Sequence, residues 1–331
     1  MLNDKLKLNK NIFNNPERRA LRDGFGEGLV LAGEENKNVV VLSADLVEST
    51  RLSDFKNLFP ERFFELGVAE QNLAAVAAGF GISGKIPFIS SYAVFSPGRN
   101  WEQIRTTICL NDSNVKIAGH HAGLSVGPDG ASHQALEDLA LARVLPNLRV
   151  FIPCDALEAK RATLAASKIH GPVYLRFSRA ATPVITSNGT PFNPGSSYLL
   201  WESGLRAKPE VALIGAGPIL YEALLAAREL EAEKIPVSVL NLHTLKPFDE
   251  SAILELAKKS KAVVTVEEHQ ISGGLGSAVS ELLSKKYPVP MEFVGVNDSF
   301  GESGRPDELI KKYGLDSRSI IKAVKKVIKR K

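Results

Sequence analysis

Residues 39–45 read VVVLSAD and residues 63–80 read FFELGVAEQNLAAVAAGF, and these two stretches decide the fold class. The first is a β-branched apolar run that ends in small and acidic residues, as a buried strand does before a loop. The second begins with another short apolar run and continues in an alanine-rich helical pattern. Residues 20–32, before the first run, carry apolar side chains at helical spacing. Strands that alternate with helices in this way predict a parallel sheet covered by helices.

The alternation extends over the whole chain with one interruption. Further strands are predicted at 87–90, 115–118, 150–152, 173–177, 211–214, 237–241, 262–267 and 292–296. Further helices are predicted at 101–110, 134–144, 155–167, 219–231, 250–259 and 275–283. Residues 186–209 interrupt the pattern because they are rich in Gly, Pro, Ser and Asn, which is typical of a linker. We therefore predict an α/β protein with two doubly wound, mostly parallel-sheet domains, at 1–186 and 210–331, joined by a linker at 187–209.

The composition is that of a globular protein. The 331 residues are 44% apolar and 24% charged, which fits two domains of ordinary size. No apolar run is long enough to span a bilayer, and the Lys- and Asn-rich N-terminal segment does not resemble a signal peptide. We therefore expect a cytoplasmic protein with no membrane partner. Cys109 and Cys154 are expected to be buried thiols, and no His, Cys or carboxylate set has the spacing of a metal site.

The C-terminal tail carries an excess of positive charge. Residues 311–331 contain nine Lys or Arg and one acid, which gives the tail a net charge of +8 in a chain of net charge +4. Apolar residues recur at helical spacing from Ile320 to Ile328. We interpret the tail as an amphipathic terminal helix with a solvated basic face, in preference to an anchor for nucleic acid or membrane.

Two glycine-rich turns resemble ligand-binding motifs. Gly215-Ala216-Gly217 follows a strand, but Leu220 stands where a dinucleotide fingerprint has its third glycine. Gly273-Gly274-Leu275-Gly276 opens a helix, where an anion could bind at the N-terminus. We interpret both as close-packed turns without a ligand.

Glu70 is the first candidate for chemistry. It opens the alanine-rich helix, where the helix dipole alone explains an acid. However, the small residues of this helix allow another helix or subunit to pack closely against it. A buried carboxyl group is driven toward its neutral form, in which it can donate a proton or a hydrogen bond. The residues alone leave both interpretations open.

Residues 119–134, which read GHHAGLSVGPDGASHQ, form the second candidate segment. They join a strand to a helix that we expect Ser132 to cap, so they lie at the carboxyl end of a parallel strand, where α/β sheets bind ligands. The glycines let the backbone approach a ligand, and the histidines can donate to a phosphate or polarise a carbonyl group. We interpret this segment as a binding loop.

The third candidate segment, residues 174–179, reads YLRFSR. Arg176 lies within the strand and Arg179 lies just past its end. An arginine there can hold a phosphate through two parallel hydrogen bonds, or it can form a surface salt bridge. The residues alone do not decide between these roles.

These segments belong to an ordered set of motifs that resembles transketolase. The pyrimidine-binding domain of that family resembles SADL at 43–46, GVAEQN at 67–72, residues 88–105, residues 121–138, PCDA at 153–156, and Ser178-Arg179. The family's C-terminal domain resembles TLKPFD at 244–249, VEEH at 266–269 and DSFGESG at 298–304. The resemblance covers nearly the whole chain. It implies a thiamine diphosphate enzyme that transfers a two-carbon ketol unit from a ketose phosphate to an aldose phosphate.

The resemblance assigns four residues to the cofactor. Glu70 corresponds to the acid that bonds to the pyrimidine ring nitrogen, and Phe95 corresponds to the aromatic residue that stacks on this ring. Tyr92 occupies a second aromatic position of the pocket, and Asp45 matches a residue near the cofactor at the subunit interface. A third aromatic position of the family falls on Gly98, so the wall of the pocket is altered there.

The resemblance also assigns the substrate site. His121, Ser49 and Arg179, together with Arg18 or the adjacent Arg19, correspond to groups that bind the sugar phosphate. Asp129 corresponds to a residue that reads a substrate hydroxyl group, although the neighbouring Pro128 replaces an acid common in the family. His133 corresponds to a residue that contacts the reacting end of the sugar. Glu70 and His133 are therefore the predicted catalytic residues.

The family also needs a domain that holds the cofactor diphosphate through Mg²⁺. Its signature is Gly-Asp-Gly followed later by Asn, and this sequence contains no Gly-Asp-Gly. The resemblance therefore implies the second subunit of a split transketolase. We expect a partner chain that carries the diphosphate and Mg²⁺ site, two of each chain in the assembly, and no nucleic-acid partner.

Other functions share some of these motifs. The β subunit of the thiamine-dependent component of 2-oxoacid dehydrogenases and deoxyxylulose phosphate synthase both contain a similar Gly-x-x-Glu-Gln motif. Residues 127–138 and the combination of His121 with Arg179 favour a phosphosugar over an oxoacid. A catalytically silent scaffold subunit is a rival of another class, and the presence of Glu70 and Phe95 beside those residues argues against it.

Overall fold

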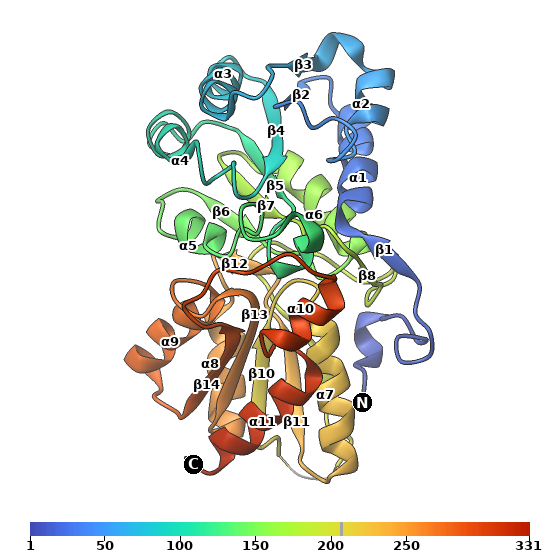
Figure 1. Cartoon of the computed structure of the whole chain (residues 1–331), viewed down its shortest axis with the longest axis vertical. Coiled ribbons are helices and arrows are strands. Elements are labelled where there is room, and N and C mark those ends of the chain that lie inside the picture. Colours follow the sequence, from blue (N-terminus) through green and yellow to red (C-terminus); the bar gives the residue numbers. More distant parts are fainter. Residues whose placement is uncertain (206–207) are drawn as a thin grey trace.

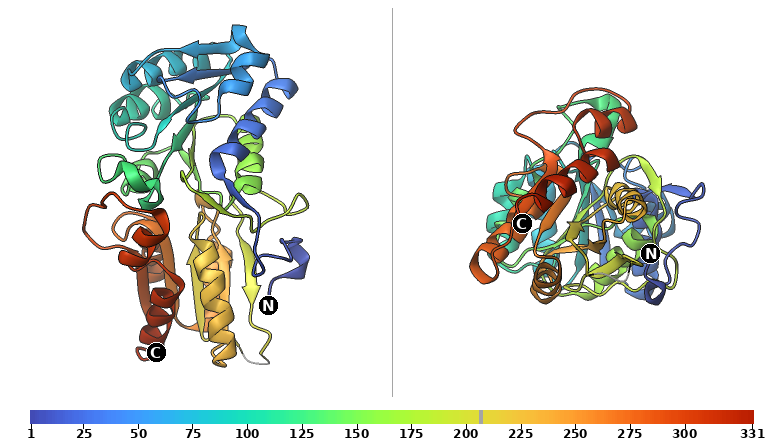
Figure 2. Two further views of the ribbon diagram at one scale, coloured as in Figure 1. Left: turned by 45° about the vertical axis from the view of Figure 1, so that its right-hand side comes forward. Right: turned by 90° about the horizontal axis from the view of Figure 1, so that it is seen from below.

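The computed structural model describes residues 1–205 and 208–331 and contains two α/β domains stacked end to end (Figure 1). The second domain, coloured yellow to red, lies below the first in this view. The N-terminal segment runs beside the second domain (Figure 2). The backbone N–H of Asn3 donates to the carbonyl of Leu200 at 3.0 Å, which ties this segment to the second domain.

The first domain is built on a seven-stranded sheet with the order β12-β6-β7-β5-β4-β2-β3. Neighbouring strands are parallel except β12, which pairs antiparallel with β6. The strands are β2 (Val39–Ser43), β3 (Phe63–Glu65), β4 (Ile86–Tyr92), β5 (Lys116–His120), β6 (Arg149–Phe151), β7 (Val173–Arg176) and β12 (Thr244–Lys246). The helices are α1 (Leu21–Glu35), α2 (Ser53–Leu58), α3 (Glu70–Ile82), α4 (Trp101–Gln103), α5 (Asp138–Arg143) and α6 (Ala156–Lys168), with the short helices η1 (Asp4–Leu6), η2 (Pro60–Arg62), η3 (Ile104–Cys109) and η4 (Leu124–Asp129). A separate antiparallel pair is formed by β1 (Arg18–Ala20) and β8 (Ala181–Pro183).

The second domain has a five-stranded sheet with the order β14-β13-β10-β11-β9. Its strands are parallel except β9, which pairs antiparallel with β11. The strands are β9 (Tyr198–Glu202), β10 (Val211–Gly215), β11 (Val237–Asn241), β13 (Val263–Gln270) and β14 (Met291–Val296). The helices are α7 (Leu220–Ala232), α8 (Glu250–Ser260), α9 (Leu275–Lys286), α10 (Pro306–Lys312) and α11 (Ser317–Ile328). The predicted α/β class with two mostly parallel sheets is confirmed.

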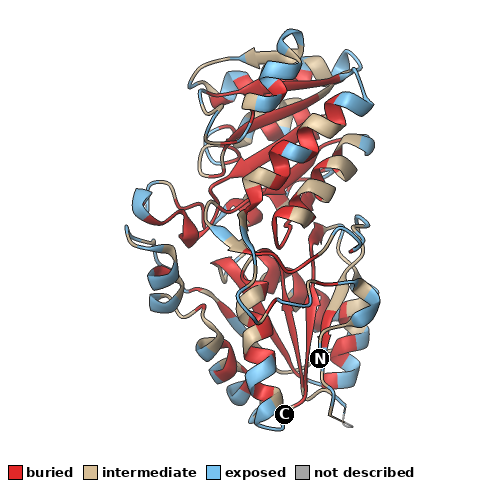
Figure 3. Cartoon of the chain, turned by 90° about the vertical axis from the view of Figure 1, so that its right-hand side faces the viewer, coloured by how far each residue is buried: buried red, intermediate tan, exposed pale blue. Residues whose placement is uncertain are grey.

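Helices cover both faces of the first sheet, so its central strands are buried (Figure 3). On one face α1 packs on α6 because glycines let the two backbones meet. A Cβ added to Gly24 would lie 1.8 Å from the carbonyl oxygen of Ala156. On the other face α3 buries Ala74 and Ala77 completely. The small residues of α3 therefore serve packing within the chain as well as any packing against a partner.

Three predicted boundaries need correction. The predicted linker at 187–209 contains β9, whose Leu200 and Trp201 are buried in the second domain, while its residues 206–207 lie outside the described residues. The helix predicted at 134–144 begins at Asp138, because Ala135 instead forms an isolated bridge with Ala122. Ser132 therefore caps no helix. The helix predicted at 101–110 has one α-helical turn and then continues as a π-helix.

Both glycine turns are closely packed and the tail forms a helix, as predicted. The side chain of Glu267 accepts the N–H groups of Leu275 and Gly276 at 2.7 and 2.8 Å, so an internal carboxylate fills the N-terminus of α9. A Cβ on Gly215 would lie 2.9 Å from the carbonyl of Val266, as expected for a close-packed turn. The tail forms α11, which buries the apolar face that begins at Ile320.

The two domains share buried contacts. β12 comes from the second half of the chain but completes the first sheet, and Ile152 N donates to His243 O at 2.7 Å beside it.

Both cysteines are free and buried, as predicted. Within the described ranges, no helix combines the length and the apolar character that crossing a bilayer requires.

Candidate active site

Glu70 lies where two neighbouring strands end. Glu65 Oε1 accepts the backbone N–H groups of Asp45 at 2.7 Å and Gly67 at 2.9 Å, and so joins the carboxyl ends of β2 and β3. Gly67 has a φ of +70°, which turns the chain into α3. The helix begins at Glu70, whose side chain is only 2% exposed. Asn100 Nδ2 donates to the Glu70 carbonyl at 3.0 Å and fixes the start of the helix.

The carboxylate of Glu70 forms an ion pair with Arg99. Arg99 Nη1 lies 2.7 Å from Glu70 Oε2, and the Arg99 guanidinium lies 4.6 Å from the centroid of the Phe95 ring. The burial expected of Glu70 is confirmed. Its partner Arg99 was not predicted, and a guanidinium interacts best with an ionised carboxylate.

Aromatic rings and histidines continue from this pair. The Tyr92 ring stacks near Phe95 with the centroids 6.1 Å apart, and it lies 4.0 Å from the His121 ring. The His133 ring is edge-on to Phe95 at 5.5 Å. The end of β4, the turn after it and the loop after β5 therefore bring four predicted site residues together next to Glu70.

His121 is held neutral at the end of β5. Its side chain is 2% exposed, and burial together with the guanidinium groups of Arg22 and Arg179 lowers the pKa of His121 to about 3. A neutral imidazole can both donate and accept a hydrogen bond. His120, by contrast, is packed between the rings of Phe25 and Phe177, with centroids 4.8 and 5.0 Å away, and is a core residue.

Two arginines form a cationic pair beside His121. Arg179 Nη1 donates to the Val126 carbonyl at 2.9 Å, and Arg22 Nη1 donates to the Ser49 carbonyl at 3.0 Å. Arg22 Nε and His121 Nδ1 are buried polar atoms without a hydrogen-bond partner among the described residues. Donors of this kind suit an anionic ligand such as a phosphate.

Arg22 was not predicted from the sequence. Arg18 or Arg19 was expected beside His121, among the groups that bind the sugar phosphate. The structure places Arg18 elsewhere: its Nη2 donates to Ala181 O at 3.0 Å, and the side chain lines a cleft of about 380 Å³ between the domains. Arg19 pairs with Glu27. The available signal for Arg22 was its position in the first turn of α1. A helix that precedes a strand of a parallel sheet runs opposite to that strand, so its first turn lies near the carboxyl ends of the strands.

The remaining predicted residues lie on the loops that follow β2 and β5. Asp45 follows β2, is exposed and has a φ of +60°. Asp129 ends η4 and is exposed, and His133 follows four residues later with its Nδ1 3.0 Å from Ser132 Oγ. Both carboxylates are therefore free to meet a ligand or a neighbouring chain.

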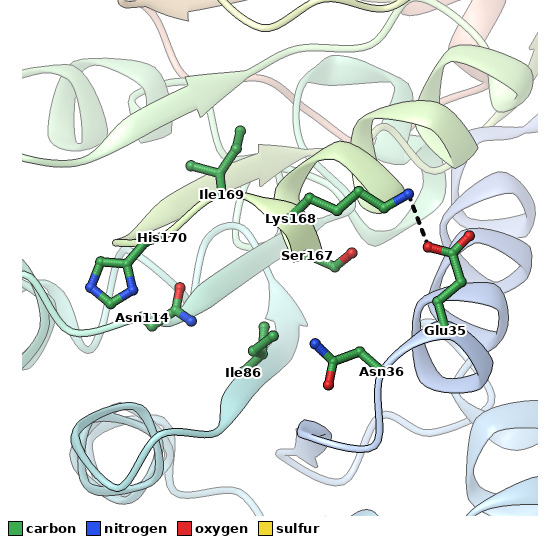
Figure 4. A pocket seen from close by; sticks show the side chains of 8 residues that line it. All are labelled: Glu35, Asn36, Ile86, Asn114, Ser167, Lys168, Ile169 and His170. Atoms are coloured by element: carbon green, nitrogen blue, oxygen red, sulfur yellow. Dashed lines mark ion pairs between the residues drawn. The ribbon is translucent and has the colours of Figure 1, made fainter.

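A cavity of about 420 Å³ lies at the opposite edge of the first sheet (Figure 4). It is lined by Asn36, Ile86 and Asn114 at the amino ends of strands, and by Lys168, which pairs with Glu35 at 2.9 Å. None of the predicted site residues lines it. The chemistry therefore belongs to the carboxyl ends of the strands, as in other α/β sheets.

Comparison with known proteins agrees with this division of the chain. Residues 17–184 match the transketolase pyrimidine-binding domain, and residues 204–320 match the transketolase C-terminal domain. The chain is similar to the transketolase C-terminal section of Methanocaldococcus jannaschii, with 42% identity over 94% of this chain and 97% of that protein. It is 38% identical to the 6-deoxy-6-sulfo-D-fructose transketolase subunit SqwH of a Clostridium species, over 95% of this chain and 96% of that subunit. A solved structure of a split gene transketolase, an inactive beta4 tetramer, is similar with a TM-score of 0.86 and 49% identity, covering 94% of this chain and 98% of that one.

The two matched domains, in this order, define the pyrimidine-binding half of a thiamine-dependent transferase fold. The chain belongs to the transketolase family and corresponds to its C-terminal half.

This family implies thiamine diphosphate and a divalent metal, and the site fits the pyrimidine of that cofactor. Arg99 already places a planar cation with N–H donors on Phe95 and against Glu70. A protonated aminopyrimidine is likewise planar and positively charged and has N–H donors. For the metal, residues 1–205 and 208–331 contain no group of three or more His, Cys, Asp or Glu side chains that could hold an ion.

Proposed function

We propose that this chain is the pyrimidine-side subunit of a two-chain transketolase that transfers a two-carbon ketol unit from a ketose phosphate to an aldose phosphate. The observation that carries the proposal is the buried carboxylate of Glu70 beside the Phe95 ring, bridged by one planar cation. Membership of the transketolase family supports the reaction class.

Four residues would hold the cofactor from this side. Thiamine diphosphate, when bound, supplies the carbon nucleophile that carries the two-carbon unit. Glu70 would hold the proton at the pyrimidine ring nitrogen, and its burial strengthens this hydrogen bond. Phe95 would lie against the ring, a contact that contributes about 1 kcal/mol beyond burial. Tyr92 and Asp45 would complete the pocket at the carboxyl ends of β4 and β2.

The cationic pair would bind the substrate phosphate. Arg22 and Arg179 together match the two negative charges of a phosphate monoester better than the single carboxylate of an oxoacid. His121 and Ser49 lie beside them and would complete this subsite. Asp129 would form a hydrogen bond with a sugar hydroxyl group. His133 would contact the reacting end of the sugar as the second catalytic residue. This arrangement favours a phosphosugar.

We infer that the diphosphate and Mg²⁺ are held by a partner chain, with two of each chain in the assembly. The relatives named as a section, a subunit and a split gene product support a two-chain enzyme. The region of α3 and η3 also leaves large apolar side chains exposed, which suits a protein contact. They are Val68 at 69%, Ile82 at 69% and Leu110 at 75% exposure.

The test is reconstitution of the two-chain enzyme. This chain, its partner, thiamine diphosphate and Mg²⁺ are mixed, and two-carbon transfer between phosphosugars is measured. We expect transfer only when all four are present, and weaker use of sugars that lack the phosphate. Conversion of a 2-oxoacid without any transfer between phosphosugars would contradict the proposal.

A further inference from the structure

The loop between β5 and α5 contains half of the proposed substrate-site residues but little regular secondary structure. His121 begins it, Asp129 and His133 lie within it, and its only regular element is the short helix η4. Three of its glycines have positive φ, so the loop conformation is unusual. A loop of this kind keeps one shape only if other parts of the molecule hold it.

The second domain holds this loop at both ends. Near its start, Glu268 Oε1 accepts the backbone N–H of Ser125 at 2.6 Å. Near its end, Gln134 Nε2 donates to the Glu302 carbonyl at 3.0 Å, and Gln270 N donates to the Leu136 carbonyl at 2.8 Å. The helix α10, at the domain junction in Figure 1, packs against η4.

Glu268 is itself fixed in place. It is 4% exposed, and Arg176 Nη2 donates to its carbonyl oxygen at 2.9 Å. Arg176 is held by Asp138, with its Nε and Nη2 at 2.8 and 3.2 Å from the two carboxylate oxygens. This buried ion pair joins β7 and α5 of the first domain to β13 of the second. The Glu268 carboxylate therefore reaches the loop from a rigid base.

The loop is shaped to receive this carboxylate. A Cβ on Gly123 would lie 2.4 Å from Glu268 Oε1, and Gly123 has a φ of +87°. Only glycine combines this backbone conformation with room for the carboxylate. A buried charge that bonds to a backbone amide is costly to disrupt, which is why this contact can determine the position of the loop.

We propose that Glu268 is a positioning residue for the sugar site: the second domain, through the Glu268–Ser125 contact, sets where Asp129 and His133 meet the substrate. The placement of the loop stands on geometry alone, whereas the effect on sugar binding rests on the proposed function. Glu70 and Phe95 lie on other elements, and the loop meets this side of the site only through ring contacts such as His133 with Phe95. We therefore expect the Glu268 contact to affect the sugar site more than the cofactor site.

Glu267 provides a matched control. It is the adjacent residue, is equally buried, and also accepts backbone N–H groups through its carboxylate, but those groups belong to α9 of its own domain. Glu267→Ala therefore removes a carboxylate of the same kind without touching the loop. Glu268→Gln keeps an oxygen that can accept the Ser125 N–H and is the conservative rescue.

The first experiment measures hydrogen exchange of the Ser125 amide in the full chain. We expect exchange at least tenfold faster in Glu268→Ala and unchanged in Glu267→Ala and Glu268→Gln. If Glu268→Ala does not fold, Glu268→Asp replaces it, because the shorter side chain withdraws the carboxylate and leaves the charge. Unchanged Ser125 exchange in a folded Ala or Asp variant would overturn the proposal.

The second experiment uses the reconstituted two-chain enzyme. We expect Glu268→Ala to raise the KM for phosphosugar at least fivefold while the Kd for thiamine diphosphate changes less than twofold. An unchanged KM, or a parallel loss of cofactor affinity, would mean that Glu268 only stabilises the fold. Absence of transfer in the wild-type enzyme would count against the proposed function, whereas the exchange result would still decide the role of Glu268 in the loop.

Discussion

Arg99 and Glu70 form an ion pair that covers the two groups proposed to receive the cofactor pyrimidine. The guanidinium bonds to Glu70 Oε2 at 2.7 Å and lies over the Phe95 ring at 4.6 Å. Glu70 is 2% exposed but Arg99 is 49% exposed, so the arginine has a path into solvent and the acid has none. It follows that a pyrimidine bound between Glu70 and Phe95 displaces Arg99.

We predict that Arg99→Ala tightens cofactor binding in the two-chain complex. An ion pair with one exposed partner contributes roughly 0.5–1 kcal/mol, so removing the competitor should lower the Kd for thiamine diphosphate about two- to fivefold. Titration calorimetry measures this change, with the exposed Arg105→Ala as the control. Weaker binding in Arg99→Ala would mean that the arginine helps to hold the cofactor.

We predict that Glu70→Gln lowers two-carbon transfer by more than a hundredfold. The amide can still accept a hydrogen bond from Arg99, so the fold and the assembly with the partner should be preserved, but it cannot exchange the proton that the carboxyl group handles. Assays of transfer and of the thermal midpoint test both expectations. Glu61→Gln is the control, because Glu61 is an exposed acid outside the site that pairs with the adjacent Arg62. Full activity in Glu70→Gln would mean that Glu70 does not have the proposed catalytic role.

We predict that Arg22→Ala and Arg179→Ala each raise the KM for phosphorylated sugars by tenfold or more. The effect on unphosphorylated sugars should be much smaller, because each arginine contributes a charge-assisted hydrogen bond to the phosphate. Arg18→Ala serves as the control, since Arg18 lies in the interdomain cleft. Steady-state kinetics with matched sugar pairs make the comparison. An equal rise in KM for both kinds of sugar would mean that these arginines do not bind the phosphate.

The fold was predictable because its signals are local. The β-branched run of β2 and the helical spacing of α1 each specify one element, and their alternation specifies the sheet. β9 was missed because its five residues stand among glycines and prolines, and only its pairing with β11 makes it a strand. The start of α5 was misplaced because Ala135 pairs with the distant Ala122, a contact that no local pattern reveals.

Site residues could be predicted where they stand in distinctive sequence segments. They could not be predicted where their position in the site depends on contacts with residues far away in the sequence. Glu70, Phe95 and His121 stand in distinctive segments, and the structure brings them together. Arg22 lies in an ordinary helical pattern, and its role depends on a packing direction that places it beside His121. Arg99 and Glu268 belong to the same class, since their proposed roles depend on contacts with residues 29 and 143 positions away in the sequence.

The neutral state of His121 leads to a prediction about pH and stability. Burial and the nearby guanidinium groups lower its pKa to about 3, whereas an unfolded histidine titrates near pH ~6.5. Between these values the unfolded chain binds a proton that the folded chain does not, so the free energy of unfolding falls as the pH drops below about 6.5.

His121→Gln removes this single contribution and leaves the other buried histidines unchanged. Relative to the wild type, the variant should therefore gain about 1.4 kcal/mol of unfolding free energy when the pH is lowered from about 7.5 to about 5.5. Denaturant unfolding of both chains at the two pH values measures the difference, and the comparison between about pH 7.5 and 8.5 should show none. A difference that stays constant down to pH ~5.5 would mean that His121 is protonated in the folded chain, and the phosphate site would then hold three cations instead of two.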